Sequence, residues 1–418
     1  MFLIQKKFFF LCFIASLLAT LSNAQIKLEY DSGYQLKLNS NRAISNFSHQ
    51  RIQNINQFYE LSDRLFKKKS LSLFRSAYKL GTLIYKQNIE NNINLAFHEY
   101  GHASRAIAIG YQASYQKVYS FQNQHYATIY QNYYKFLLDL FDHSNYEGAW
   151  VIYAGQSFSS LSFLSTAQLN AIISAGGVNN ESDLAVLMAD QIYSHNQASF
   201  LDIFWYSKNK LSVYLYSKDD EENEKEGDYN GDISKLLQFY NTSYDLNMTH
   251  KDIQKYNLIA FVLSASTWQY INTGIVSLLR DQNQVKTFNI PFMRLPELDF
   301  YLNYQGPSYK LRSALKLSST MNIPFAYEKV IKGKQQQEFS LGLEKKWGQK
   351  IITKTMFIFG EKIEYSQELN YNMFKKFSIN MGWFHYNGHN LHGMRHIPNL
   401  KEQSLKDSEA WMSIVIKL

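Results

Sequence analysis

The five residues His98-Glu99-Tyr100-Gly101-His102 have the types and spacing of a metal-assisted hydrolytic site. Residues four apart on a helix lie on one face, so the two imidazoles would point the same way. Two such imidazoles can bind one Zn²⁺, and the carboxylate between them can take a proton from a water molecule that the ion activates. The motif therefore predicts zinc at His98 and His102, with Glu99 as the general base.

The residues on both sides of this motif favour a buried helix. Residues 89–109 contain no proline, and their only glycine is Gly101. Asn91 or Asn92 can cap the helix at its start, and Gly110 can end it. Gly101 stands next to the second histidine and permits another segment to approach closely. These features predict a helix whose motif face is shielded from water.

The motif resembles that of the zinc metallopeptidases of the zincin type, and its form with glycine before the second histidine is similar to that of the site-2 proteases. The resemblance implies that His98 and His102 are metal ligands and that Glu99 is the catalytic base. It also implies a protein or peptide substrate. It covers the segment around the motif and not the rest of the chain.

A catalytic zinc ion needs a third protein ligand and keeps one position open for water. Gly176-Gly177 interrupts an uncharged stretch, and Asn179 or Asn180 can cap a new helix, which would place Glu181 in its first turn. In the Glu-ligand zincins the third ligand comes from a downstream helix, so Glu181 is the favoured candidate. The helix dipole alone also favours an acid in a first turn. The alternatives are Asp183, Asp190, Glu147 and His125.

Two long stretches, residues 148–180 and 256–279, contain no Asp, Glu, Lys or Arg. Each is long enough to cross a bilayer. Both contain many Ser, Gln, Asn and Thr residues, and the mean hydropathy of the chain is −0.33. Buried helices of a globular region are therefore the favoured interpretation, and the spanning helices of an intramembrane protease are the alternative.

The acidic segment 217–232 is nearly devoid of apolar residues, which predicts an exposed loop. Its last residues, Asp228, Asn230 and Asp232, have the spacing of ligands in a calcium loop. Ile233 stands where such a loop needs its glycine, so the prediction is a loop without a metal site.

Residues 1–24 have the features of a secretory signal, with Lys6 and Lys7 before an apolar run that is too short to cross a bilayer. An uncleaved N-terminal anchor is the alternative. Cleavage before Gln25 would remove Cys12, the only cysteine, so disulfides and cysteine chemistry are not expected. The formal charge would fall from +8 to +6 (8 − 2), which does not indicate nucleic-acid binding. We expect export to the periplasm or outer membrane of a bacterium, with secretion or the inner membrane as alternatives.

All five prolines lie after residue 290, where strict alternation of apolar residues begins. This alternation predicts an antiparallel sheet of roughly six to eight strands. Residues 26–38 alternate as well, so they are candidates for pairing with that sheet. The expected fold class is α+β. We expect the chain to divide into a signal (1–24), an N-terminal strand (25–40), a helical metallopeptidase-like region (41–290) and an antiparallel β region (291–418).

The β region, with a chain total of 31 Tyr, resembles bacterial outer-membrane β-proteins. A barrel associated with the outer membrane and a soluble sheet both remain open. The favoured function is zinc-dependent hydrolysis of peptide bonds in the cell envelope. The alternatives are an outer-membrane β-barrel or binding protein with a degenerate metal site, and an intramembrane protease similar to the site-2 proteases.

Overall fold

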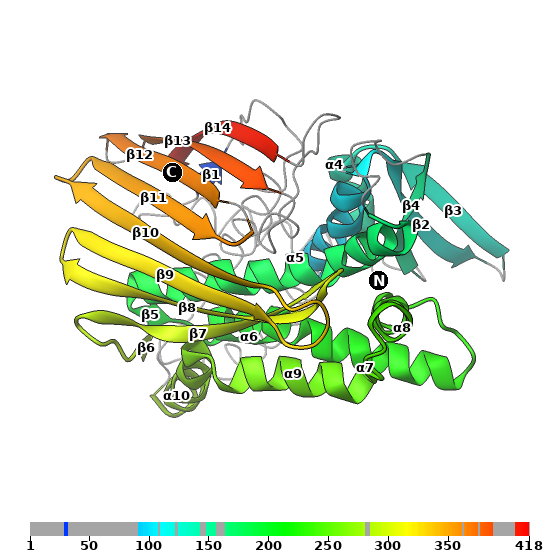
Figure 1. The fold of residues 1–418 in the computed structure, drawn as a ribbon. Helices are drawn as coiled ribbons and strands as arrows, with labels where there is room; N and C mark the ends of the chain where they lie inside the picture. The colour runs from blue at the N-terminus through cyan, green and yellow to red at the C-terminus, as the bar shows by residue number, and fades with distance from the viewer. Residues whose placement is uncertain are drawn as a thin grey trace.

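The structure is a computed structural model, and it confirms the α+β class: helices pack beside an antiparallel sheet (Figure 1). All structural statements below concern the described part of the chain, which comprises residues 29–31, 91–107, 109–121, 124–142, 148–155, 164–280, 285–361, 363–374, 377–387 and 406–417. The predicted signal and most of the expected helical region before residue 91 therefore lie outside the described residues.

The large sheet has the linear order β1-β14-β13-β12-β11-β10-β9-β8-β7 within the described residues. Every neighbouring pair from β7 to β14 is antiparallel, as the alternation predicted. The strands are β7 (Met293–Asn303), β8 (Gly306–Ser318), β9 (Met321–Val330), β10 (Gln337–Trp347), β11 (Ile351–Phe359), β12 (Ile363–Phe374), β13 (Phe377–Asn387) and β14 (Lys406–Lys417).

A short N-terminal strand joins the far edge of this sheet. β1 (Glu29–Asp31) pairs antiparallel with β14, with Tyr30 opposite Ile416. The first described residues of the chain therefore lie beside the last ones, and the helical region is inserted between them. This is the pairing for which residues 26–38 were a candidate.

A second sheet, which the sequence did not predict, lies within the region expected to be helical. Its order is β3-β2-β4, with β2 (Gln112–Phe121), β3 (Gln124–Tyr130) and β4 (Gly148–Ala154). The alternation of β2 is obscured because Lys117 is buried beside Val118, where its Nζ lies 2.7 Å from Asp139 Oδ2. The expectation that residues 148–180 are entirely helical is thus wrong at β4.

The longest helix is α5 (Thr166–His195), which starts at a capping box formed by Ser165 and Gln168. It runs without a break through Gly176-Gly177, so the expected interruption there and a new cap at Asn179 or Asn180 are both wrong. The helix carries buried residues on every side, because it lies between other elements along most of its length. Besides α5 and the helix at residues 91–107, the described residues form α4 (Tyr133–Asp142), α6 (Phe200–Lys210), α7 (Ser212–Lys225), α8 (Asp232–Tyr244), α9 (His250–Val262) and α10 (Ala265–Arg280).

The acidic segment is also not the exposed loop that its composition predicted. Residues 217–225 form most of α7, in which Ser217 and Asp220 are buried. Glu and Lys are good helix formers, and the helix contacts α9 through Gln254, whose Nε2 donates to Glu221 Oε2 at 3.0 Å. Only residues 226–231 connect α7 to α8.

Two hydrophobic clusters hold these layers together. One joins α5, α8, α9 and the start of the large sheet, and the other joins the helix at residues 91–107 to α4, α5 and α6. In the described residues, we find no helix with the length and apolar character needed to cross a bilayer.

Candidate metal centre

The motif lies on a buried helix, as the sequence predicted. This HEYGH helix (residues 91–107) has Ala96, Phe97 and Ala103 fully or almost fully buried. It ends at Gly110, whose φ is +112° and whose N–H donates to the carbonyl of Ile107 at 3.0 Å. A glycine at this position relieves the strain of a left-handed residue, which explains why the helix stops there.

Glycines let α5 cross the HEYGH helix at very short range. A Cβ on Gly101 would overlap the carbonyl oxygen of Gly176, and a Cβ on Gly176 would overlap that of Gly101. A Cβ on Gly177 would press against the Nε2 atoms of both His98 and His102. The three glycines therefore bring the α5 backbone directly beneath the two imidazoles, which is the close approach that Gly101 predicted.

Two adjacent asparagines of α5 bond this helix to the elements on either side of it. Asn180 Nδ2 donates to the carbonyl of Phe97 at 3.0 Å, while its Oδ1 accepts a bond of 2.9 Å from Arg105. Asn179 turns the other way and pairs with the backbone of Leu302 on β7 through bonds of 2.6 Å and 3.0 Å. The helix α5 is thus bonded to the HEYGH helix on one side and to the large sheet on the other.

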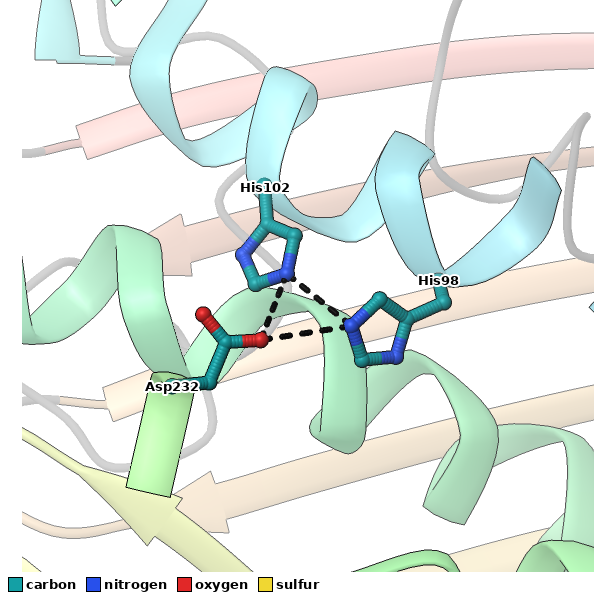
Figure 2. A group of neighbouring side chains, drawn as sticks. All are labelled: His98, His102 and Asp232. Atoms are coloured by element: carbon teal, nitrogen blue, oxygen red, sulfur yellow. Dashed lines mark hydrogen bonds and ion pairs between the residues drawn. The ribbon is translucent and has the colours of Figure 1, made fainter. Parts of the chain in front are cut away.

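The two imidazoles converge on the carboxylate of Asp232 (Figure 2). The Nε2 atoms of His98 and His102 lie 3.1 Å apart. Oδ2 of Asp232 lies 3.3 Å from Nε2 of His98 and 3.0 Å from Nε2 of His102. Among the His, Cys, Asp and Glu side chains of the described residues, these three form the one group whose ligand atoms all lie within 4.8 Å of one another.

Asp232 is held by the structure at the start of α8. The carboxylate of Asp220 on α7 accepts bonds from the backbone N–H groups of Ile233 (2.8 Å) and Ser234 (3.2 Å), so it caps α8 from outside. Gly231 lacks a side chain where one would overlap the Asp220 carboxylate. These contacts hold the first turn of α8 in place, and Asp232 in that turn faces the histidines.

The other end of α8 is bonded to the turn between β7 and β8. Tyr240 donates from its hydroxyl to the carbonyl of Asn303 at 2.8 Å, and Tyr244 does so to Tyr304 at 2.9 Å. The same part of the sheet bonds to α5 through Leu302 and Asn179. One edge of the large sheet thus sets the relative positions of the helix that carries Asp232 and the helix beneath the imidazoles.

Glu181 contacts the site, but on the outer side of His98. Its Oε1 lies 2.9 Å from Nδ1 of His98, the ring nitrogen that points away from His102 and Asp232. The ring of Tyr216 stacks on the imidazole of His98 at a centroid distance of 4.5 Å. Nδ1 of His102 is likewise engaged, at 2.7 Å from the carbonyl of Ile173. Both imidazoles are therefore oriented by their Nδ1 partners and present Nε2 to Asp232.

The remaining candidates for the third ligand lie elsewhere or outside the described residues. Asp183 accepts a bond of 3.1 Å from the hydroxyl of Tyr301 on β7. Asp190 forms ion pairs with Arg294 and Arg312 of the large sheet. Glu147 and the side chain of His125 lie outside the described residues.

Glu99 lies beside the cluster and is almost fully buried. Its Oε2 has no hydrogen-bond partner within the described part of the chain. Burial raises the pKa of Glu99 to about 7, and the neighbouring His102 and His98 oppose this shift only in part. A carboxylate of this kind is suited to exchange a proton with a small molecule placed next to it.

The charges of the cluster reinforce one another. Burial lowers the pKa of His98, but the bonds to Asp232 and Glu181 outweigh it and raise that pKa well above its usual value. Burial raises the pKa of Asp232, but His102 and His98 outweigh it and hold that pKa well below its usual value. Without an ion, protons on the imidazoles thus balance the charge of the Asp232 carboxylate, and a cation bound between the three side chains would replace those protons.

Sequence reasoning missed Asp232 because the residue was assigned to a solvated loop. A signal was present: Ile233, Leu236, Leu237 and Tyr240 have helical spacing and are all buried, which marks Asp232 as the first residue of a helix. An acid in a first turn is favoured by the dipole without any metal. Nothing in the sequence indicated that this first turn meets the HEYGH helix.

Comparisons with known proteins place this chain in no family: no family model, no curated protein and no solved structure matches it.

Proposed function

We propose that this protein is a zinc-dependent peptidase in which His98, His102 and Asp232 hold the ion and Glu99 is the general base. The residues present fit such an ion. All three ligand atoms face one point, and a buried carboxylate without a partner for one oxygen lies beside them. Two neutral imidazoles and one carboxylate form a common donor set of catalytic zinc, which keeps a further position open.

The observation that carries the proposal is the triangle formed by the three ligand atoms. Two ligands of a tetrahedral ion with bonds of 2.0–2.1 Å lie about 3.3 Å apart. The three sides of the triangle measure 3.1 Å, 3.3 Å and 3.0 Å. The side chains therefore already have the spacing of one face of a tetrahedron around a zinc ion.

Glu181 and the carbonyl of Ile173 contact the Nδ1 atoms of the two imidazoles, on the side away from the proposed ion. Each accepts a hydrogen bond from an Nδ1–H, which fixes the tautomer that leaves Nε2 free to bind a cation. Glu181 is thus proposed as an orienting residue rather than as the third ligand.

A bound zinc ion would lower the pKa of a water molecule and polarise the carbonyl of a substrate. Glu99 would accept the proton of that water and return it to the leaving amine. The buried surroundings of Glu99, with Phe97 and Ala96 on the same helix, exclude bulk solvent from the proton transfer. The expected substrate is a protein or peptide of the bacterial cell envelope, since the N-terminal residues have the features of an export signal.

The test is the replacement Glu99→Gln, which preserves size and cannot accept the proton. We expect about one zinc per chain in both proteins by metal analysis, and a fall in peptide hydrolysis of roughly two to four orders of magnitude in the variant. His98→Ala is the matched variant that should lose the metal itself.

Hydrolysis by Glu99→Gln at the original rate would refute the role of Glu99. Unchanged zinc content in both His98→Ala and His102→Ala would refute the metal site.

A further inference from the structure

One face of the large sheet exposes large apolar side chains, and the other face buries several acidic ones. On one face of β8–β12, five residues form a row of direct cross-strand neighbours: Leu311, Tyr327, Phe339, Phe359 and Ile363. These five side chains are between 41% and 60% exposed. Large apolar residues in register across five strands, all facing outward, form one continuous apolar surface.

A second row runs beside the first and extends the surface to β13. It contains Phe325, Leu341, Phe357 and Tyr365 as direct cross-strand neighbours, and His385 follows Tyr365 on β13. Leu341 and Phe357 are 42% and 44% exposed. Further along the same face lie Leu343, Leu315 and Met381, which are also exposed. We call this surface of β8–β13 the apolar face.

The opposite face of the same strands buries several polar side chains beside apolar ones such as Val330 and Ile358. Glu328 and Glu338 are direct cross-strand neighbours, and they are 2% and 3% exposed. Glu364 on β12 is fully buried. Ser308 donates from its hydroxyl to Glu328 Oε1 at 2.9 Å on this inner face. A sheet of a water-soluble protein normally has the reverse arrangement, with its apolar side chains inside.

The charged residues of the apolar face lie only near the ends of the strands. Over the described side chains of β9 and β10, this face includes Lys329 and Lys345 and contains no Asp, Glu or Arg. Lys345 lies over the ring of Trp347 at 3.8 Å from its centroid, and Trp347 is exposed at the end of β10. Lysine and tryptophan at the margin of an apolar band are typical of a membrane–water interface.

The length of the strands matches the same environment. The strand β10 (Gln337–Trp347) has 11 residues. A tilted strand needs about 9–11 residues to cross the hydrocarbon core of a bilayer. A protein partner would need polar groups to pair with, since interfaces are only slightly more than half apolar, and the two rows offer few such groups.

We propose that the apolar face of β8–β13 lies against the acyl chains of a lipid bilayer. The surface needs no shape-specific partner, because lipid hydrocarbon contacts any apolar side chain without requiring hydrogen bonds. This inference is independent of the zinc site and stands whether or not the protein is a peptidase.

The test uses the full chain in a Cys12→Ser background, with single cysteines introduced at Leu341, at Phe357 and, as a control, at Leu215. Leu215 lies on α7 and is 42% exposed, which matches the exposure of Leu341. Each protein is labelled with an environment-sensitive dye and reconstituted into phosphatidylcholine vesicles with or without brominated acyl chains.

We expect the dyes at positions 341 and 357 to shift to the blue and to lose most of their emission in the brominated vesicles. The dye at position 215 should show neither change. Paired replacement of Leu341 and Phe357 by Lys should reduce recovery of the protein with floated vesicles, while Leu215→Lys should not.

Equal emission of the dyes at 341 and 357 in both kinds of vesicle would overturn the proposal. A dimer detected by light scattering, with the dyes at both positions already shifted to the blue in the absence of lipid, would also overturn it. That result would show that a second copy of the chain covers the face.

Discussion

Oδ2 of Asp232 lies 3.0 Å from Nε2 of His102, although the two residues belong to helices that are distant in the sequence. Asp232 is the first residue of α8, and the cap from Asp220 leaves this turn little freedom. The carboxylate therefore meets the imidazoles as part of the folded scaffold and not as a mobile loop side chain.

Asp232→Ala should remove the proposed third ligand atom and so should cause a large loss of zinc affinity. Competition with a chromogenic chelator measures this affinity directly. Asp228→Ala is the matched control, because Asp228 is an exposed acid of the same connection and its Oδ1 accepts a bond of 2.9 Å from the backbone N–H of Asn230. Equal zinc affinity in both variants would exclude Asp232 as a ligand.

Glu181→Gln should weaken zinc binding less than Asp232→Ala does. Its carboxylate acts on Nδ1 of His98, and the loss of such an outer contact reduces metal affinity by about 10- to 100-fold. Asp183→Asn, two residues away and bonded to Tyr301, should leave the affinity unchanged. If Glu181→Ala abolished zinc binding while Asp232→Ala did not, Glu181 would be the third ligand after all.

Gly177→Ala should lower zinc affinity although alanine favours helices over glycine by about 1 kcal/mol. The added methyl group would press against both Nε2 atoms, which are the proposed ligand atoms. Gly101→Ala should instead lower the melting temperature, because it forces the two helix backbones apart. Ser194→Ala, at the exposed end of α5, is the control for both readouts, which are chelator competition and circular dichroism. Unaltered zinc affinity in Gly177→Ala would show that α5 does not lie beneath the site.

Asp299→Asn should destabilise the protein at neutral pH and reduce its sensitivity to acid. Burial raises the pKa of Asp299, but Arg312 and Lys210 outweigh it and lower that pKa to about 2. An unfolded aspartate has a pKa of about 3.9, so the carboxylate contributes about 2–3 kcal/mol above pH 4. This contribution is lost as the pH falls from about 4 to about 2, because protonation then favours the unfolded chain.

Urea unfolding at pH 7 and at pH 3 measures this effect. The difference in unfolding free energy between the two pH values should be smaller in Asp299→Asn than in the unaltered protein. Asp219→Asn, an exposed residue of α7, should retain the original difference. Identical pH dependence in all three proteins would contradict the role of the Arg312–Asp299–Lys210 cluster.

The sequence by itself determined the local features of this protein. The apolar spacing around His98 and His102 and the glycine at position 110 specified a buried helix that ends there, because helical periodicity and a left-handed terminus are properties of neighbouring residues. The alternation after residue 290 likewise specified antiparallel strands, since period two is visible along each strand.

Only the tertiary structure decided which distant residues meet the motif. From local sequence patterns, Gly176-Gly177 predicted the end of one helix and the start of another. In the structure, packing against Gly101 stabilises a continuous α5 instead. Glu181 therefore lies on the outer side of His98. The charge of the segment that contains Asp232 predicted a loop. In the structure Asp232 contacts both histidines, because Asp220 caps the start of α8 and the other end of α8 is bonded to the β7–β8 turn. Contacts of this kind depend on how elements pack and not on local spacing, so no pattern in the sequence could specify them.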